Sequence, residues 1–330
     1  MSTPHLLDLP TEIINHILTP LPTSSLLRFS ETSRHARILA NANLHTLSLG
    51  IAPLAPAFFK YLDPSITTST ANPYEIWLRI PQARSYEYLT LHNFQSALVT
   101  SILKRHGTML QHLNISVWAL TLPMAKAVTS LRALRTFSLR IESGVRYVRG
   151  IPRSRIAIER EEQGKAWDVL TESAAEWSGR LTTLKLENCD VRAEQLAVLL
   201  KETRGCKELG LNRCRYLGRE MWTSLGEWEG RAKLKMLDVA ECGGLLGDEA
   251  REVLGTLDGL QVRYFVCLLT AATCMLTPKQ TLNLYDCQEQ RPGEFEGLNE
   301  ELWHIKDFTA PRPGGYGENM IIEVDPDYIF

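Results

Sequence analysis

Hydrophobic residues near the start of the chain recur at the spacing of a helix. Leu9, Ile13 and Ile17 are four residues apart, and Ile14 and Leu18 repeat that interval one position later. Residues at this interval lie on one side of an α-helix. The pattern therefore predicts a short helix with apolar side chains on more than one face.

Prolines and small polar residues mark the ends of this helix and predict two more. Pro10 suits the first helical position because its missing N–H would be unpaired there anyway. The segment 20–22 contains two prolines that end the element, and Thr23 can cap a second helix that extends to Phe29. A third helix is predicted for residues 33–40. We therefore expect three short helices within residues 9–43.

A different pattern recurs from residue 44 onward. It consists of apolar residues at the first, fourth and sixth positions, followed after two further residues by cysteine or a bulky apolar residue. Clear copies begin at Leu110, Leu134, Leu181, Cys206 and Leu234, and fainter copies begin at Leu44, Tyr86, Leu257 and Lys279. Allowing for two gaps of double length, the copies are about 25 residues apart, which is within the range of leucine-rich repeats.

The spacing within each copy predicts a buried strand followed by a returning helix. Alternate side chains of a strand point to the same face, so the two inner apolar residues of each copy are expected to enter one core. Helical patterns lie between copies at 95–106, 193–200 and 248–257. The sequence therefore predicts a solenoid of parallel strands with helices on its outer side.

The cysteines follow the same repeat. Four of the seven, Cys189, Cys214, Cys242 and Cys287, occupy one repeat position, and the chain contains no Cys-x-x-Cys pair. A small buried thiol at that position can pack and hydrogen-bond the backbone of the turn. We expect reduced, structural thiols in an intracellular protein rather than a disulfide framework.

Two stretches interrupt the repeat and are interpreted as insertions or degenerate repeats, near 63–81 and 143–163. The second carries the only basic cluster, formed by Arg146, Arg149, Arg153, Arg155 and Arg160. Such a cluster could bind a phosphorylated, acidic or nucleic-acid partner. Because three glutamates at 159, 161 and 162 dilute its charge, we interpret it as a solvated loop. Residues 288–330 lack the repeat and are expected to form an irregular tail.

Charge and motif content argue against several classes of function. The chain has 36 lysine and arginine residues against 38 acidic ones, so no global positive charge favours nucleic acid or a membrane surface. Its longest apolar stretch, 265–276, is shorter than the ~20 residues of a membrane helix. No phosphate loop, dinucleotide fingerprint, catalytic signature or metal-ligand spacing is present. We expect a non-catalytic protein with no cofactor, metal or membrane partner.

Two family resemblances follow from these patterns. The residues Leu9-Pro10-x-Glu12-Ile13-Ile14, with the later Ser25-Leu26-Leu27-Arg28-Phe29-Ser30, resemble the F-box motif. The repeats resemble cysteine-type leucine-rich repeats, and the order of the two is that of F-box leucine-rich-repeat proteins. The resemblance implies an α/β fold: a three-helix F-box at 1–45 and a leucine-rich-repeat horseshoe at 46–287, ahead of the tail.

The resemblance also implies a function. In this family the F-box binds a Skp-type adaptor, which binds a cullin with its RING subunit, and the repeats hold the protein substrate for ubiquitin transfer. The N-terminal segment lacks the basic region and apolar run of a secretory signal, so we expect a cytoplasmic or nuclear location. A scaffold that binds an adaptor without assembling a cullin ligase is the alternative, because it requires the same motif.

Carried over by position, the motif assigns one set of residues to the adaptor interface and the small core behind it, two roles that the sequence does not separate. They are Leu9, Pro10, Ile13, Ile17, Leu18, Leu21, Leu26 and Leu27. Three short helices cannot bury all of these residues among themselves, and an exposed apolar patch usually marks a partner site.

Substrate is expected on the concave face of the horseshoe, where side chains alternate with the buried strand residues. The candidates are His112, Asn114, Arg140, Lys185, Glu187, Glu208, Asn212, Met236 and Asp238. This set contains both acidic and basic residues and therefore does not indicate a particular ligand.

Overall fold

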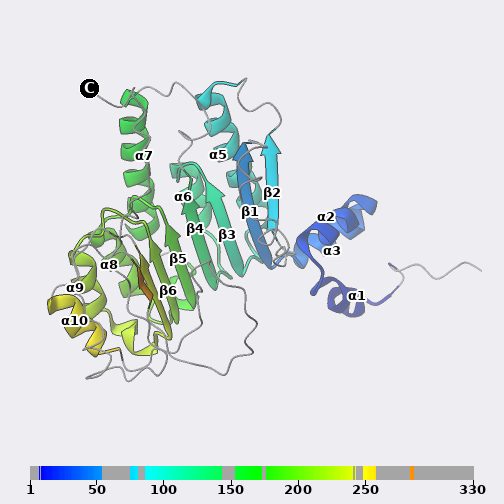
Figure 1. Ribbon diagram of the computed structural model, residues 1–330. Coiled ribbons are helices and arrows are strands. Elements are labelled where there is room, and N and C mark those ends of the chain that lie inside the picture. The colour runs from blue at the N-terminus through cyan, green and yellow to red at the C-terminus, as the bar shows by residue number, and fades with distance from the viewer. Residues whose placement is uncertain are drawn as a thin grey trace, which may run out of the picture.

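Three N-terminal helices lead directly into a parallel β-sheet (Figure 1). The computed structural model describes residues 7, 9–53, 75–80, 86–142, 153–172, 176–240, 242, 248–257 and 283–285. Within these residues the sheet has eight strands, and the fold is α/β. The expected leader of three helices and the expected parallel strands are both confirmed.

The three helices are α1 (Thr11–Leu18), α2 (Thr23–Thr32) and α3 (Arg34–Ala42). The carbonyl of Pro10 accepts the first backbone bonds of α1, and that of Pro22 accepts those of α2. Ser33 caps α3, since its hydroxyl accepts from the backbone N–H of Ala36 at 3.0 Å. Local signals in the sequence therefore determine where each helix begins.

The sheet has the strand order β2-β1-β3-β4-β5-β6-β7-β8, and every neighbouring pair is parallel. Its strands are β1 (Thr46–Pro53), β2 (Glu75–Ile80), β3 (His112–Val117), β4 (Thr136–Ile141), β5 (Thr183–Glu187), β6 (Glu208–Asn212), β7 (Met236–Ala240) and β8 (Asn283–Tyr285). All five clear copies of the repeat form strands, as do the copies at Leu44 and Lys279. The strand expected after Leu257 lies outside the described residues.

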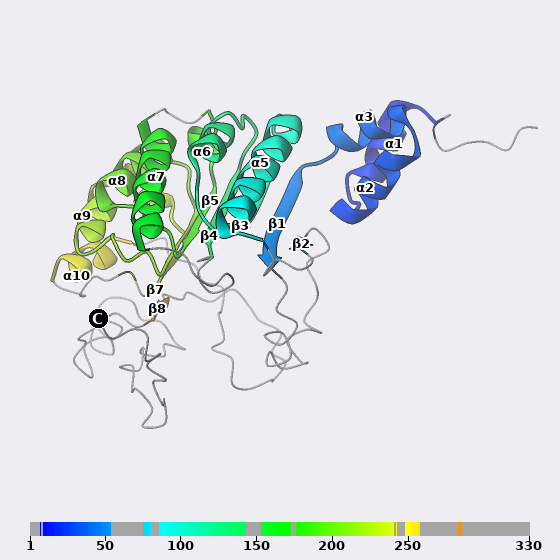
Figure 2. The ribbon, with the colours of Figure 1, turned by 90° about the horizontal axis from the view of Figure 1, so that it is seen from above.

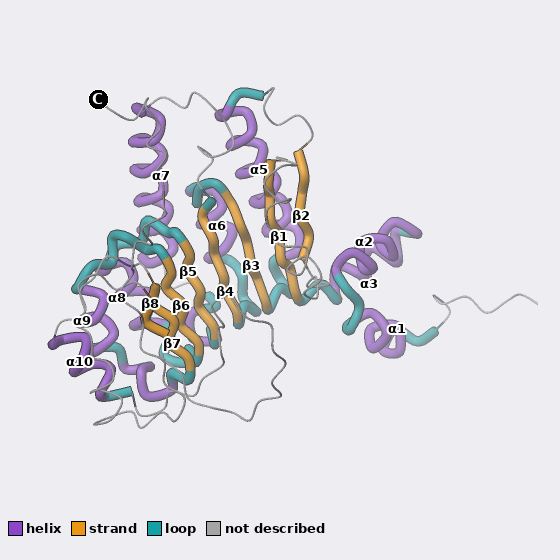
Figure 3. Tube along the Cα trace, viewed as in Figure 1, coloured by secondary structure: helices purple, strands orange, loops and turns teal. Residues whose placement is uncertain are grey.

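Helices cover one face of the sheet (Figures 2 and 3). They are α5 (Tyr88–His106), α6 (Leu122–Thr129), α7 (Arg153–Glu172), α8 (Ala193–Glu202), α9 (Glu220–Glu227) and α10 (Asp248–Gly255). Two 3-10 turns, Ser178–Arg180 and Glu229–Lys233, precede β5 and β7. The inner apolar residues of β3–β7, such as Leu184 and Leu186 of β5, are fully buried in the core. We call the other side of the sheet the opposite face.

One predicted repeat is wrong. Residues from Tyr86 to Phe94, interpreted as a strand copy, lie at the start of α5, which extends the helix predicted for 95–106 toward the N-terminus. Tyr88, Leu91 and Val99 are buried at helical spacing, whereas Phe94 is exposed. The strand of this part of the chain is β2, which lies in the stretch interpreted as an insertion and pairs with the outer edge of β1.

The arginine-rich stretch also differs from expectation. Residues 153–163 belong to α7 rather than to a solvated loop, and this helix lies between β4 and β5 in the chain, as a degenerate repeat would place it. Ala166, Trp167 and Leu170 of α7 are buried. Residues 143–152, the tail 288–330 and the cysteines at 267, 274 and 287 lie outside the described residues.

Candidate functional site

Helix α1 presents apolar side chains on two sides. Ile14 and Leu18 are each 1% exposed and belong to the core. Ile13 and Ile17 are 47% and 40% exposed, and Leu9, which precedes α1 by two residues, is also exposed. Ile13 and Ile17 are four residues apart and therefore lie on one side of α1. We call Leu9, Ile13 and Ile17 the α1 stripe.

The structure shows which residues of the F-box motif are buried and which are exposed. Of the residues carried over from it, Leu18 and Leu26 are buried, Leu21 is half-buried, and five are exposed: Leu9, Pro10, Ile13, Ile17 and Leu27. Sequence reasoning missed Ile38 of α3, which is 67% exposed. The sequence could have indicated this, because Ala36, Leu39 and Ala40 mark the buried side of the helix and Ile38 does not fall on that side.

The helices are attached to the sheet without a linker. The hydroxyl of Thr23, at the start of α2, donates to the carbonyl of Thr46 in β1 at 3.3 Å. The carbonyl of His45 accepts from the backbone N–H groups of Gln111 and His112, at 2.8 and 3.0 Å. The Thr23 bond joins α2 to β1, and the His45 bonds begin the pairing of β1 with β3.

The nine residues proposed for substrate binding all lie on strands β3–β7, at half-buried or exposed positions. In-register pairing places them in rows across the sheet. Arg140 is aligned with Glu187, which is aligned with Asn212, and Gly210 is aligned with Asp238. Their positions alternate with the buried leucines, so these side chains lie on the opposite face.

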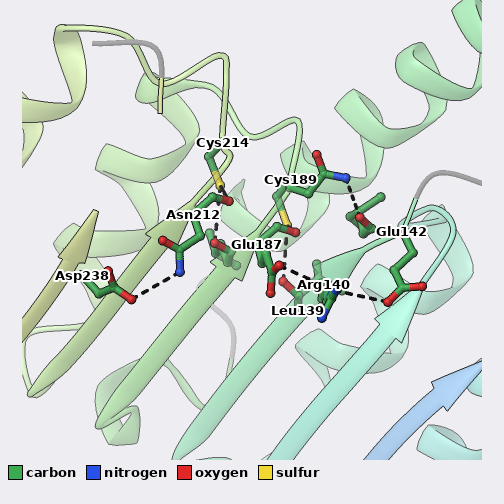
Figure 4. Close-up of polar contacts among 11 residues, drawn as sticks. Leu139, Arg140, Glu142, Glu187, Cys189, Asn212, Cys214 and Asp238 are labelled. Carbon is green, nitrogen blue, oxygen red and sulfur yellow. Dashed lines mark hydrogen bonds and ion pairs between the residues drawn. The ribbon is translucent and has the colours of Figure 1, made fainter. Parts of the chain in front are cut away.

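Charged groups on the opposite face pair largely with one another (Figure 4). Arg140 lies 3.3 Å from a carboxylate oxygen of Glu142 and 3.6 Å from one of Glu187. Lys185 lies 3.8 Å from a carboxylate oxygen of Glu208. These partly exposed pairs contribute little stability. They leave the face with few unpaired charges.

Asp238 is an exception on this face. The side-chain amide of Asn212 donates to one of its carboxylate oxygens at 3.3 Å. Among the described residues, the other carboxylate oxygen has no hydrogen-bond partner, although it is buried. Burial raises the pKa of Asp238, while the Asn212 bond and the charge of Lys185 oppose that shift. A carboxylate is therefore held here against its desolvation cost.

The repeat cysteines form a ladder at the ends of successive strands (Figure 4). The thiols of Cys189, Cys214 and Cys242 donate to the carbonyls of Leu139, Leu186 and Leu211 in the preceding strands, at 3.5, 3.5 and 3.0 Å. The pKa of Cys214 is raised well above its usual range, first by the hydrogen bond to the Cys189 thiol and also by burial. The expected structural role of these three thiols is confirmed.

The arginines of α7 are held by nearby carboxylates. Arg155 pairs with Glu159 at 3.1 Å and with Glu162 at 3.6 Å. Arg160 lies 3.9 Å from Asp190 and its guanidinium lies over the ring of Tyr216. Glu159 also accepts from the hydroxyl of Tyr88 at 2.7 Å. Internal pairing therefore occupies the described part of this cluster.

Within the described ranges no cluster of histidine, cysteine and acidic residues could hold a metal ion. No described helix is both long and apolar enough to pass through a bilayer.

Comparison with known protein families matches residues 6–44 to the F-box domain. The match covers α1, α2 and α3, including the α1 stripe. No curated protein matches the chain. The match covers the N-terminal helices only and leaves the sheet without a family assignment.

Proposed function

We propose that this chain is the substrate-recognition subunit of an SCF-type ubiquitin ligase. F-box domains typically bind Skp-type adaptors and are generally non-catalytic. In our proposal, residues 6–44 bind the adaptor and, through it, a cullin with its RING subunit. The parallel sheet, which we interpret as a leucine-rich-repeat domain, holds the protein substrate. The chain itself performs no chemistry.

The observation that carries this proposal is the α1 stripe. Exposed apolar surface costs roughly 25 cal/mol for each Å² that remains in water, and folding alone does not recover this cost. Ile13 and Ile17 are exposed on one side of α1 and Leu9 is exposed just before the helix, while Ile14 and Leu18 on the other side are buried. A contiguous exposed patch within an F-box match supports adaptor binding at this place.

The attachment of α2 and α3 to β1 supports the second half of the proposal. The bond from Thr23 to the Thr46 carbonyl joins α2 to β1, and only three residues separate the end of α3 from the start of β1. A substrate bound on the sheet is thereby held at a constant position relative to the adaptor. Ubiquitin transfer in a large complex requires such positioning.

The leucine-rich-repeat interpretation is supported by the regularity of β3–β7. Each of these strands pairs in register with the next, and each buries its inner apolar residues toward the helices. The three cysteine thiols bind the preceding strand in the same way at three successive repeats. A solenoid built from neighbouring repeats requires this kind of nearest-neighbour contact.

The test is co-purification of the full chain with the Skp-type adaptor and cullin. We expect the wild type to capture both, and the Ile13→Asp, Ile17→Asp variant to capture neither, because two carboxylates would be buried in the apolar contact. The matched control is Leu89→Asp, Phe94→Asp, which places the same charges at two exposed apolar positions of α5. Circular dichroism checks that both variants are folded.

The outcomes distinguish a subunit of a cullin ligase from a scaffold that acts without a cullin. Capture of adaptor and cullin by the wild type and the control, with loss in the Ile13 and Ile17 variant, supports the ligase proposal. Capture of the adaptor without cullin would favour a scaffold that acts without a cullin ligase. A wild type that captures neither protein would overturn the proposed function.

A further inference from the structure

The residues that immediately precede the strands form a continuous row along one edge of the sheet. Each backbone N–H donates to the carbonyl of the preceding member: Gln111 to His45 at 2.8 Å, and Arg135 to Gln111, Thr182 to Arg135, Lys207 to Thr182 and Lys235 to Lys207 at 2.7 Å. We call these six residues the edge row. Since neighbouring strands are about 4.8 Å apart, adjacent side chains of the row are separated by a similar distance.

The edge row carries positive charge and no acidic residue. Arg135, Lys207 and Lys235 are exposed, and none of them takes part in an ion pair within the described part of the chain. Two nearby arginines differ in this respect. Arg132 pairs with Glu176 at 2.6 Å and Arg204 with Glu229 at 3.0 Å. The row therefore keeps cations that are not neutralised by these carboxylates.

A cleft of about 430 Å³ opens beside the row. Its lining residues are Gln111, Ala133, Arg135, Arg180 and Thr182. Arg180 is held in place by its bond to the carbonyl of Arg132 at 3.2 Å, and the hydroxyl of Thr182 donates to the carbonyl of Arg135 at 3.0 Å. Two guanidinium groups thus line a cleft that contains no carboxylate, and guanidinium groups bind carboxylates in a bidentate manner.

The pKa of the neighbouring His112 responds to the positive charge of the edge row. The pKa of His112 is lowered, mainly by burial and further by the charges of Arg135 and His45. One ring nitrogen of His112 lies 3.0 Å from the hydroxyl of Thr136, on the first row of the opposite face. The positive charge of the edge therefore reaches the surface where we place the substrate.

We propose that the edge row and its cleft bind an acidic segment of the substrate protein. This inference relies on the proposed function only in identifying the bound partner as a substrate. Carboxylate side chains pair with Arg135 and Arg180 in the cleft, and further acidic residues reach Lys207 and Lys235 along the row. The row contains no aromatic residue other than the imidazole of His45, so it lacks the stacking platform of a single-strand nucleic-acid site.

The test measures fluorescence anisotropy of a labelled peptide of alternating glutamate and glycine with the full chain. We expect an affinity that falls as salt rises, and no binding of the same peptide with glutamine in place of glutamate. The Arg135→Glu, Lys207→Glu, Lys235→Glu variant is expected to bind at least about tenfold more weakly. The neutral Arg135→Gln, Lys207→Gln, Lys235→Gln variant is expected to lie between it and the wild type.

The matched control is Lys104→Glu, Lys126→Glu, Lys201→Glu, which makes the same change in net charge on exposed positions of α5, α6 and α8. Equal weakening by this control would overturn the inference, because it would show a response to net charge alone. Tighter binding of a single-stranded oligonucleotide than of the peptide would also overturn it. Adaptor capture by the same variants reports on the proposed function separately, since residues 6–44 are unchanged.

Discussion

The side-chain amide nitrogen of Asn43 donates to the side-chain oxygen of Asn15 at 2.9 Å, which joins the end of α3 to the middle of α1. The same nitrogen donates to the carbonyl of Leu39 at 2.8 Å, and the hydroxyl of Thr19 donates to the Asn43 side-chain oxygen at 3.1 Å. Asn43 is buried, so these bonds satisfy a polar group that would be costly to leave unpaired. They also hold the α1 stripe in a fixed orientation relative to α3.

Replacement of Asn43 should therefore loosen the F-box. We expect Asn43→Ala to lower the free energy of unfolding by roughly 1–2 kcal/mol, because it removes the buried bond to the Leu39 carbonyl and the partly buried bonds with Asn15 and Thr19. Urea denaturation followed by circular dichroism measures the effect. Arg37→Ala, at an exposed position of α3, is the control and should leave the midpoint unchanged. Equal midpoints for the two variants would show that the network contributes no stability.

Helix α7 supplies a test of the arginine-rich stretch. Trp167 is fully buried, so Trp167→Ala should lower the free energy of unfolding by roughly 3–5 kcal/mol through lost burial and a cavity. Glu161→Ala removes the exposed 2.7 Å pair with Lys165 and should leave stability almost unchanged. Urea denaturation midpoints of the two variants measure both changes in stability. A mild effect of Trp167→Ala would contradict the packing of α7 against the sheet.

The sequence predicted the strands that carry a local signal and missed the elements whose place depends on distant partners. In β5 the buried Leu184 and Leu186 alternate with polar residues because one side of the sheet faces the helices. Strand β2 pairs with the outer edge of β1, a position that no local pattern specifies. The charged residues of α7 concealed the few apolar positions, among them Trp167, by which it packs.

The candidate site was predictable in position but not in exposure. The F-box motif located the apolar residues, yet only the packed helices show that Ile14 is buried while Ile13 is exposed. The cysteine position was predicted correctly because the repeat places a thiol beside the preceding strand. The edge row was missed, since Arg135, Lys207 and Lys235 are far apart in the chain and adjoin only when the strands are paired.

The buried thiol of Cys206 should make the protein less stable as the pH becomes alkaline. Burial raises the pKa of its thiol to about 11, so the folded state keeps the proton after the unfolded chain loses it near pH ~8.5. Its contribution is therefore complete below about pH 8.5 and is lost as the pH rises from there to about 11. Between pH 8 and pH 10.5, the wild type should lose roughly 2 kcal/mol more stability than Cys206→Ala. Parallel losses in urea titrations of both proteins would contradict this pKa.

Replacement of the carboxylate of Asp238, on the opposite face, should stabilise the protein. Burial raises its pKa, so the charged form is disfavoured in the folded state at neutral pH. Because Asp238 is only partly buried, we expect Asp238→Asn to raise the free energy of unfolding at pH 7 by no more than about 1 kcal/mol. The gain should disappear near pH ~3, below the ordinary aspartate pKa of about 3.9, because the unfolded chain is then protonated as well. Urea midpoints at the two pH values measure it, with Glu187→Gln at another position of the opposite face as control. A less stable Asp238→Asn protein at pH 7 would show that the carboxylate makes a favourable contact. A more stable one would show that the carboxylate lowers the stability of the folded protein, as expected of a residue that contributes to binding.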